Sequence, residues 1–548
     1  MSRAPIGRSP KGTACINCRQ RKIVSSIYRD SLPSFIPLLP YPSDAMENVL
    51  ASVDQLLREE IAILETRLQQ LEHPSDPSPS LTLQPAGSSS GSRSHAPLNI
   101  SLNMRQALFH SFLPYSFEFG FFLDHSRFAA SIVSSSSQDQ PFPSILSACQ
   151  LFGAYLSPVN ELSALQPAFL AQALYDTSTG LSRDPVHLAR SILHSVQAEV
   201  LLAQYLFING RALEGKYRIS NAVSMVLGAG FHKIRATDAY AFHGRAGTHL
   251  ISPPMSPEEE GERINALWQV VILNACWTAA DGSPSNIAYE VPESRIDAPW
   301  PLDSGSYSQT SFPESVQSSR TIQNFLSNYP DNGHSLLALH AKAAILFERA
   351  SSLQRQYNPN MNLADATRFQ QTFNNLNNAI NNIAPILPSV TGPNLSRETI
   401  RRLLVVHTLC RVASILLHGT FEDQDRASNT QILTAAESVV MLLHSVNLPD
   451  FPFIDPIMGH LWSITTNVFI KEIKINITTR VPRRLPLKDM MDSVEFIVAT
   501  MQIFAPNSSF IVEPCSTSNG EYQTVIEILF PTRPTSKAQV TAAINVNP

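Results

Sequence analysis

Apolar residues recur at helical spacing through most of the chain, from about residue 99 to residue 509, and this stretch constrains the fold more than any other feature. In residues 191–207, for example, Ile192, Val196 and Val200 fall on one face of a helix. The alternation that is typical of β-strands is scarce over the same stretch. The sequence therefore predicts an all-α fold with a large helical domain at residues 99–510 and a C-terminal tail at 511–548.

Local signals predict where several of these helices begin and end. A helix over 212–227 would stop at the Gly-Ala-Gly sequence at 228–230, which lacks the third glycine and the preceding strand of a dinucleotide-binding loop. The Ser-Pro-x-Glu sequence at 256–259 is a capping box that would start a helix ending at the Asp-Gly pair 281–282. We expect further helices at 336–355, 364–383, 396–418, 427–446 and 487–504, and a surface loop at 301–334.

Several short motifs of this helical stretch occur in an order known from one family. They are QAEVLLA at 197–203, GRALEG at 210–215, LGAGFH at 227–232, ER at 262–263, LW at 267–268 and SPS at 283–285. Together they resemble the fungal-specific transcription factor domain, or middle homology region, over roughly residues 105–300. The resemblance implies a nuclear protein that regulates transcription. Asn274 stands where that family often has an acid, so a role that depends on the acid is not expected here.

A second cluster of informative residues lies near the start of the chain. Cys15 and Cys18 are separated by two residues and followed by Arg19, Arg21 and Lys22. Two thiols at this spacing can hold one soft metal ion, and the basic residues suit a polyanion. Because no βαβ pattern surrounds the two cysteines, a thioredoxin-like redox site is not indicated.

This stretch resembles the first half of the fungal Zn2Cys6 binuclear cluster, a zinc-dependent DNA-binding module. The resemblance implies that Cys15 and Cys18 are zinc ligands, that Arg21 and Lys22 approach the bases of double-stranded DNA, and that Arg19 contacts phosphate.

The second half of that cluster is missing. The third cysteine of the family pattern would fall at Ser25, and a hydroxyl does not replace a thiolate that bridges two zinc ions. Cys149, Cys276, Cys410 and Cys515 are too scattered to complete a compact cluster. The departure begins at residue 24, and one hypothesis is that residues 24–50 are a retained intron, because Val-Ser can be encoded by the usual first bases of an intron.

Residues 45–72 follow an irregular segment at 30–44 and predict a short coiled coil. Leucines recur at seven-residue intervals, which is the pattern of a heptad seam. In a parallel pair, Glu60 would repel Glu65 of the other chain, whereas Arg67 would attract Glu72. A homodimer is expected, and the alternative is an amphipathic helix packed on its own chain. The residues of the proposed seam are Leu57, Ile61, Leu64, Leu68 and Leu71.

Composition separates the remaining parts of the chain. Residues 73–98 are rich in proline, glycine and serine and predict a disordered linker. Residues 1–29 carry seven basic residues and no acid, whereas the net charge of the whole chain is −5, so a basic arm precedes an acidic body.

The six cysteines, at irregular spacing, fit a reducing compartment. No apolar run is long enough to predict a membrane span.

No enzymatic motif is present, and we expect no catalytic activity. The sequence has no HExxH, GxSxG or P-loop pattern, and its histidines are not at ligand spacing. A cavity between helices could bind a small effector that the sequence does not identify. The two leading functions are a zinc-dependent DNA-binding regulator of RNA polymerase II transcription, and a DNA-binding-deficient regulatory protein that acts through the helical domain.

Overall fold

The structure is a computed structural model. It describes residues 100–529 except 135–139, 183, 238–250, 304–306, 308–311, 313–315, 393, 423–424 and 480–483. The chain divides into two compact units, Met1–Arg93 and Ser94–Pro548, and the described residues belong to the second unit.

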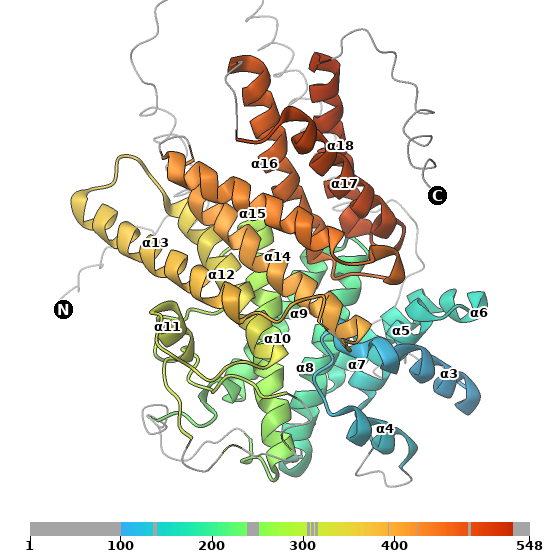
Figure 1. The fold of residues 1–548 in the computed structure, drawn as a ribbon. Helices are drawn as coiled ribbons and strands as arrows, with labels where there is room; N and C mark the ends of the chain where they lie inside the picture. The colour runs from blue at the N-terminus through green and yellow to red at the C-terminus, as the bar shows by residue number, and fades with distance from the viewer. Residues whose placement is uncertain are drawn as a thin grey trace, which may run out of the picture. The chain divides into compact units, whose positions relative to one another are not determined.

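The fold of the described residues is all-α, which confirms the predicted fold class. Among these residues no strand forms, and the β-bridge that they contain joins Ala236 to Ser318. The helices, shown in Figure 1, are α3 (Leu102–Phe112), α4 (His125–Val133), α5 (Pro143–Leu156), α6 (Asn160–Ser163), α7 (Gln166–Thr179), α8 (Pro185–Ile208), α9 (Ala212–Gly228), α10 (Pro257–Asp281), α11 (Thr321–Leu326), α12 (Leu336–Gln356), α13 (Leu363–Ile383), α14 (Arg397–Gly419), α15 (Arg426–His444), α16 (Ile457–Thr479), α17 (Leu487–Phe504) and α18 (Ser509–Leu529). Short 3₁₀ helices include η1 (Leu113–Phe119) and η2 (Phe231–Lys233).

Helix α10 begins and ends where the sequence predicts. The Ser256 hydroxyl accepts a hydrogen bond from the Glu259 N–H at 3.2 Å, and the Glu259 carboxylate accepts from the Met255 N–H at 2.9 Å. The second bond reaches one residue beyond the N-cap, so the capping box is present in a shifted form. At the other end, Gly282 adopts φ 73°, a left-handed conformation that costs glycine little.

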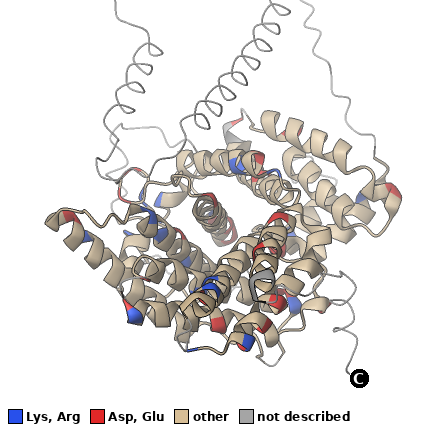
Figure 2. Cartoon of the chain, turned by 90° about the horizontal axis from the view of Figure 1, so that it is seen from above, with Lys and Arg blue, Asp and Glu red and all other residues tan. Residues whose placement is uncertain are grey.

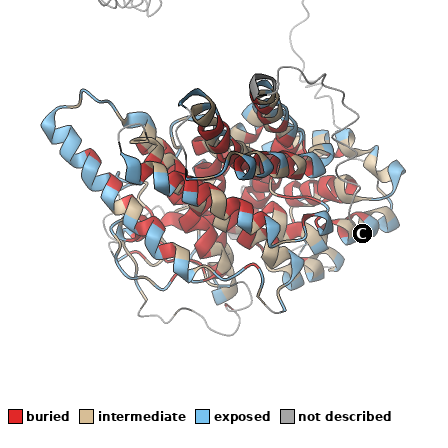
Figure 3. Ribbon diagram, turned by 45° about the horizontal axis from the view of Figure 1, so that its top comes forward, coloured by how far each residue is buried: buried red, intermediate tan, exposed pale blue. Residues whose placement is uncertain are grey.

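Helix α10 is also the centre of the packing. It contacts α8, α9, α12 and α16, and it is buried along nearly its whole length. Figure 3 shows that the buried residues gather in the middle of the helical body. Trp268 stacks on Trp300 with ring centroids 4.3 Å apart, and Trp277 stacks on Phe207 at 3.5 Å. The contact of α10 with α16 joins parts of the chain that are far apart in the sequence.

Two predicted boundaries need correction. The tail predicted at 511–548 contains most of α18, which packs against α16 and α17 and buries Ile511, Tyr522 and Val525. Helix α16 was not among the predicted helices. Pro514 and a polar stretch obscure the periodicity of α18, and its burial comes from contacts with distant helices rather than from local signals.

The segment predicted as a surface loop at 301–334 is also more buried than expected. It contains α11, and Tyr307, Ile322 and Phe325 are buried against the body. The Tyr307 ring lies directly beside Gly261 of α10, where an added Cβ would collide with the ring. These aromatic side chains are spaced irregularly, so no periodic pattern marks their burial.

One helix of the described residues could cross a membrane as judged by length and hydropathy alone, contrary to the sequence-based expectation. It is α8 over His187–Ile208, and all of its apolar window is buried inside the helical body. That is the environment of a core helix, which passes the same test.

Figure 2 shows Lys and Arg mixed with Asp and Glu along the helices, so neither positive nor negative charge gathers on one face in this view.

Candidate functional site

The site residues predicted from the sequence lie outside the described part of the chain. They are Cys15 and Cys18 as zinc ligands, Arg19, Arg21 and Lys22 for DNA, and Leu57, Ile61, Leu64, Leu68 and Leu71 for dimerisation. Within residues 100–529, as far as they are described, no group of three or more His, Cys, Asp or Glu could hold a metal ion. The zinc and DNA assignments therefore stay predictions.

The four cysteines of the helical body are core residues. Cys149, Cys276, Cys410 and Cys515 are free and buried. Burial raises the pKa of all four thiols, that of Cys410 to about 12. They are protonated at neutral pH, as expected for thiols that pack as small apolar groups.

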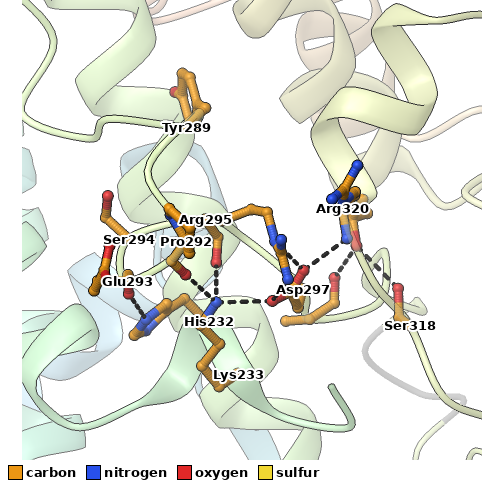
Figure 4. Close-up of polar contacts among 12 residues, drawn as sticks. His232, Lys233, Tyr289, Pro292, Glu293, Ser294, Arg295, Asp297, Ser318 and Arg320 are labelled. Atoms are coloured by element: carbon orange, nitrogen blue, oxygen red, sulfur yellow. Dashed lines mark hydrogen bonds and ion pairs between the residues drawn. The ribbon is translucent and has the colours of Figure 1, made fainter. Parts of the chain in front are cut away.

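A buried carboxylate, Asp297, joins three distant segments of the body (Figure 4). Its oxygens accept hydrogen bonds from Lys233 Nζ at 2.7 Å, from Arg295 Nε at 2.9 Å and from the Arg320 backbone N–H at 2.6 Å. Burial alone would raise the pKa of Asp297, but these hydrogen bonds outweigh it and hold the pKa below its usual range. The carboxylate is thus ionised and fully engaged in holding the fold.

The backbone carbonyl and the ring of His232, in the LGAGFH motif, form hydrogen bonds next to this network. The His232 carbonyl accepts from the N–H groups of Asp297 and Ala298 at 2.9 and 3.0 Å. Its ring Nε2 donates to the Glu293 carbonyl at 2.8 Å, and burial lowers the pKa of His232 to about 4, so the neutral ring is the donor. The motif at 227–232 therefore connects the end of α9 to the segment after α10.

Asn274 anchors the turn that follows α10. The residue is fully buried, its Nδ2 donates to Ser285 Oγ at 2.9 Å, and its Oδ1 accepts from Asn286 Nδ2 at 2.9 Å. An amide supplies both the donor and the acceptor that this turn uses. An ionised carboxylate would supply acceptors alone, so the amide matches its surroundings.

A cavity lined by both apolar and polar side chains lies between η1, α8, α10, α12 and α14. It has two chambers of about 40 and 50 Å³, which share Phe117, Gln269 and Arg402 as walls. We call these two chambers together the interior cavity. Three of its polar side chains, Gln204, Gln269 and His340, come from three different helices and are 3%, 4% and 8% exposed.

Hydrogen-bond partners are missing for these side chains among the described residues. Gln204 Oε1 is a buried oxygen without a partner. No side-chain hydrogen bond is made by Gln269 or by the His340 ring. A buried polar atom that is left unbonded costs roughly 1–3 kcal/mol of stability. Gln204 Oε1, with two further unbonded polar side chains beside it, therefore favours a polar occupant of the cavity.

The charged groups of the interior cavity are unevenly paired. Arg401 forms an ion pair with Glu118, and both side chains are buried. Arg402 donates to the Phe117 carbonyl at 3.0 Å, and its guanidinium lies 5.8 Å from the centre of the Phe117 ring. No carboxylate of a described residue lies within ion-pair distance of Arg402.

Burial shifts the titration of the groups around this cavity. Burial and, to a lesser extent, the charge of Arg402 together lower the pKa of His340 to about 3, so the imidazole is neutral. Burial also raises the pKa of Asp455 to about 6 and lowers the pKa of Arg401 to about 10. Thus burial disfavours the charged form of all three groups.

The sequence analysis allowed for a cavity between helices, but it identified none of the residues that line the interior cavity. Gln204 and Gln269 look like ordinary polar residues of amphipathic helices, and nothing local shows that they face inward. The available signal was weak: each interrupts a run of apolar residues, at 200–207 and 266–273. The Asp297 network was likewise missed, although its His232 lies in a motif that was singled out.

Comparison with known proteins gives one family. The family model described as fungal specific transcription factor domain matches residues 109–384. No curated protein and no solved structure matches the chain.

Proposed function

Because this chain belongs to the family of the fungal specific transcription factor domain, which is a family of transcription regulators rather than of enzymes, we propose that it regulates RNA polymerase II transcription as a DNA-binding protein in the nucleus. The observation that carries the proposal is the match over residues 109–384, with the Cys15–Cys18 motif and its basic residues ahead of it. In this proposal Cys15 and Cys18 hold zinc, and Arg21 and Lys22 approach base edges in the major groove.

One observation favours a second function. Ser25 occupies the position of the third cysteine, so the two thiolates supply half of the tetrahedral shell of one zinc ion. An arm without a complete cluster can still neutralise phosphates, but it cannot hold Arg21 and Lys22 at a fixed angle. The chain would then act through its helical domain, as a partner or competitor of DNA-binding proteins.

DNA competition binding separates the two functions. The full chain is titrated at physiological salt against duplexes with paired CGG half-sites, which many proteins with a Zn2Cys6 cluster favour, and against unrelated duplexes of equal length. A preference of about a hundredfold, in the range that specific readout supplies, supports the DNA-binding regulator. Weak binding that ignores sequence and falls steeply with salt supports the second function.

The matched variants are Arg21→Gln with Lys22→Gln, and Arg3→Gln with Arg8→Gln, which remove the same charge from the same arm. If the first pair alone abolishes the preference, these two residues read the bases. If both pairs weaken binding equally on all duplexes, the arm contributes charge alone and the base-reading role is wrong.

A further inference from the structure

The interior cavity supports an inference that is independent of DNA binding. From its unpartnered polar groups and its charges, we propose that the interior cavity binds a small carboxylate anion. The cavity lies wholly within the helical body and involves no residue of the N-terminal arm, so a chain that fails to bind DNA could still bind this ligand.

Unbonded polar groups line the cavity. The side-chain amides of Gln204 and Gln269 and the His340 ring face the cavity from α8, α10 and α12 without partners among the described residues. An amide supplies two N–H donors, and a neutral imidazole supplies one. The three groups together offer donors that line one chamber, which is an arrangement that suits an oxygen-rich ligand.

The charge of Arg402 indicates that the ligand is an anion. The guanidinium of Arg402 borders both chambers, and burial lowers the pKa of Arg402 because the charged form is poorly solvated there. Glu398 favours its charge from a distance, and so does Asp303, which borders the second chamber, but neither forms an ion pair with it. A guanidinium presents N–H groups in a fork that matches a carboxylate, so an anion in the cavity would supply the missing counter-charge.

The remaining charges argue for one negative charge rather than two. Glu118 is already neutralised by Arg401. Asp455 borders the first chamber with its pKa raised to about 6 by burial, so at neutral pH it adds negative charge that would repel a dianion. A monocarboxylate therefore fits better than phosphate.

The size of the chambers limits the size of the ligand. The chambers measure about 40 and 50 Å³, and a water-sized group needs about 10–15 Å³. Each chamber thus holds roughly three or four such groups, which corresponds to acetate or a similar short carboxylate. Aromatic walls at Phe117, Phe119 and Phe453 would receive the apolar end of the anion.

The test uses the full chain and measures its melting temperature in sodium acetate, sodium chloride and acetamide, at equal ionic strength and pH 7. Acetate should raise the melting temperature in a saturable manner, because it binds the folded state, whereas chloride and the neutral isostere acetamide should not. Saturation-transfer NMR from the protein to the acetate methyl group reports binding directly.

The variants are Arg402→Gln and Arg397→Gln, which remove equal charge from the same helix. Arg397 is exposed at the start of α14 and makes no contact with the cavity. The acetate effect should be lost in R402Q and kept in R397Q. If R402Q does not fold, Gln269→Leu replaces it, with an expected loss of at least tenfold in acetate affinity.

Three results would overturn the proposal. Acetate could stabilise the wild-type chain no more than chloride does, which would leave water as the occupant. R402Q could respond like the wild-type chain, which would place acetate elsewhere. Inorganic phosphate could bind while acetate does not, which would replace the carboxylate with a polyanion.

Discussion

At the scale of single residues, Asn274 shows how a buried side chain is matched to its neighbours. Its amide donates to Ser285 and accepts from Asn286 inside the core. We expect Asn274→Asp to destabilise the fold by about 1–3 kcal/mol at pH 7, because an ionised carboxylate loses the donor and must be buried. Urea denaturation measures this change.

The pH dependence of that variant has a definite sign. Burial would raise the pKa of the introduced carboxyl above its value in the unfolded chain, so the loss of stability is largest above the folded pKa and shrinks as the carboxyl is protonated at lower pH. Asn378→Asp, on the exposed face of α13, is the control and should change little. A loss that is equal at pH 5 and pH 7 would contradict this account.

At the scale of elements, α18 offers a sharp test of packing. Ile511 is buried in α18 against Gly459 of α16, whereas its neighbour Val512 is 46% exposed. Ile511→Asp should cost more than about 3 kcal/mol, because it buries an unpaired charge. Val512→Asp should stay within about 0.5 kcal/mol. Thermal unfolding compares the two, and equal tolerance would mean that α18 does not pack as described.

The coiled coil predicted at residues 45–72 lies outside the described residues and is tested separately. Replacing Leu57 and Leu64 with glutamine should convert a dimer into a monomer and leave the helical body folded, because the seam loses two d-position leucines. Sedimentation velocity and circular dichroism measure the two effects. A wild-type chain that already sediments as a monomer at micromolar concentration would instead favour a seam within one chain.

The same scale shows what could be predicted from the sequence. The start of α10 at Ser256 and its end at Gly282 follow from local chemistry, and the bounds of α9, α12, α13 and α17 agree with their periodicity. Helices α16 and α18 were missed because tertiary contacts rather than local signals decide their burial. The interior cavity depends on which way Gln204 and Gln269 face, and that direction is set by helices far away in the sequence.

At the scale of the whole molecule, buried histidines set the response to acid. Burial lowers the pKa of His194 and His340 to about 3, and that of His232 and His460 to about 4. Such groups bind protons in the unfolded chain near pH 6 but not in the folded one. The neutral histidines therefore stabilise the folded state above the unfolded pKa of about 6.5, and this stabilisation is lost as the pH falls toward their folded pKa values.

This pattern predicts how steeply stability falls. The four histidines would take up four protons on unfolding near pH 5.5, while Asp455, with a pKa of about 6 when folded, releases most of one. The net uptake of about three protons makes the free energy of unfolding fall by about 4 kcal/mol per pH unit. His125, His407 and His418, whose pKa burial also lowers, make this fall steeper, and the glutamates whose pKa is raised make it shallower. Urea denaturation between pH 6.5 and pH 5 measures the slope.

His194→Gln isolates one of these protons. His194 Nδ1 accepts from the Phe142 N–H at 3.3 Å, and a glutamine oxygen can accept that bond in its place. The variant should reduce the slope by about 1.4 kcal/mol per pH unit. An unchanged slope would show that His194 is not a proton acceptor on unfolding.

The contacts of α10 and α12 also decide how the protein can be divided for expression. The family match ends at residue 384, yet α10 packs on α16 and α12 packs on α14, and both partners lie beyond that residue. A fragment truncated at residue 384 would expose the apolar faces of two central helices, and we expect it to aggregate. A soluble fragment of this body should extend through Leu529, because the unit that folds is larger than the unit that homology outlines.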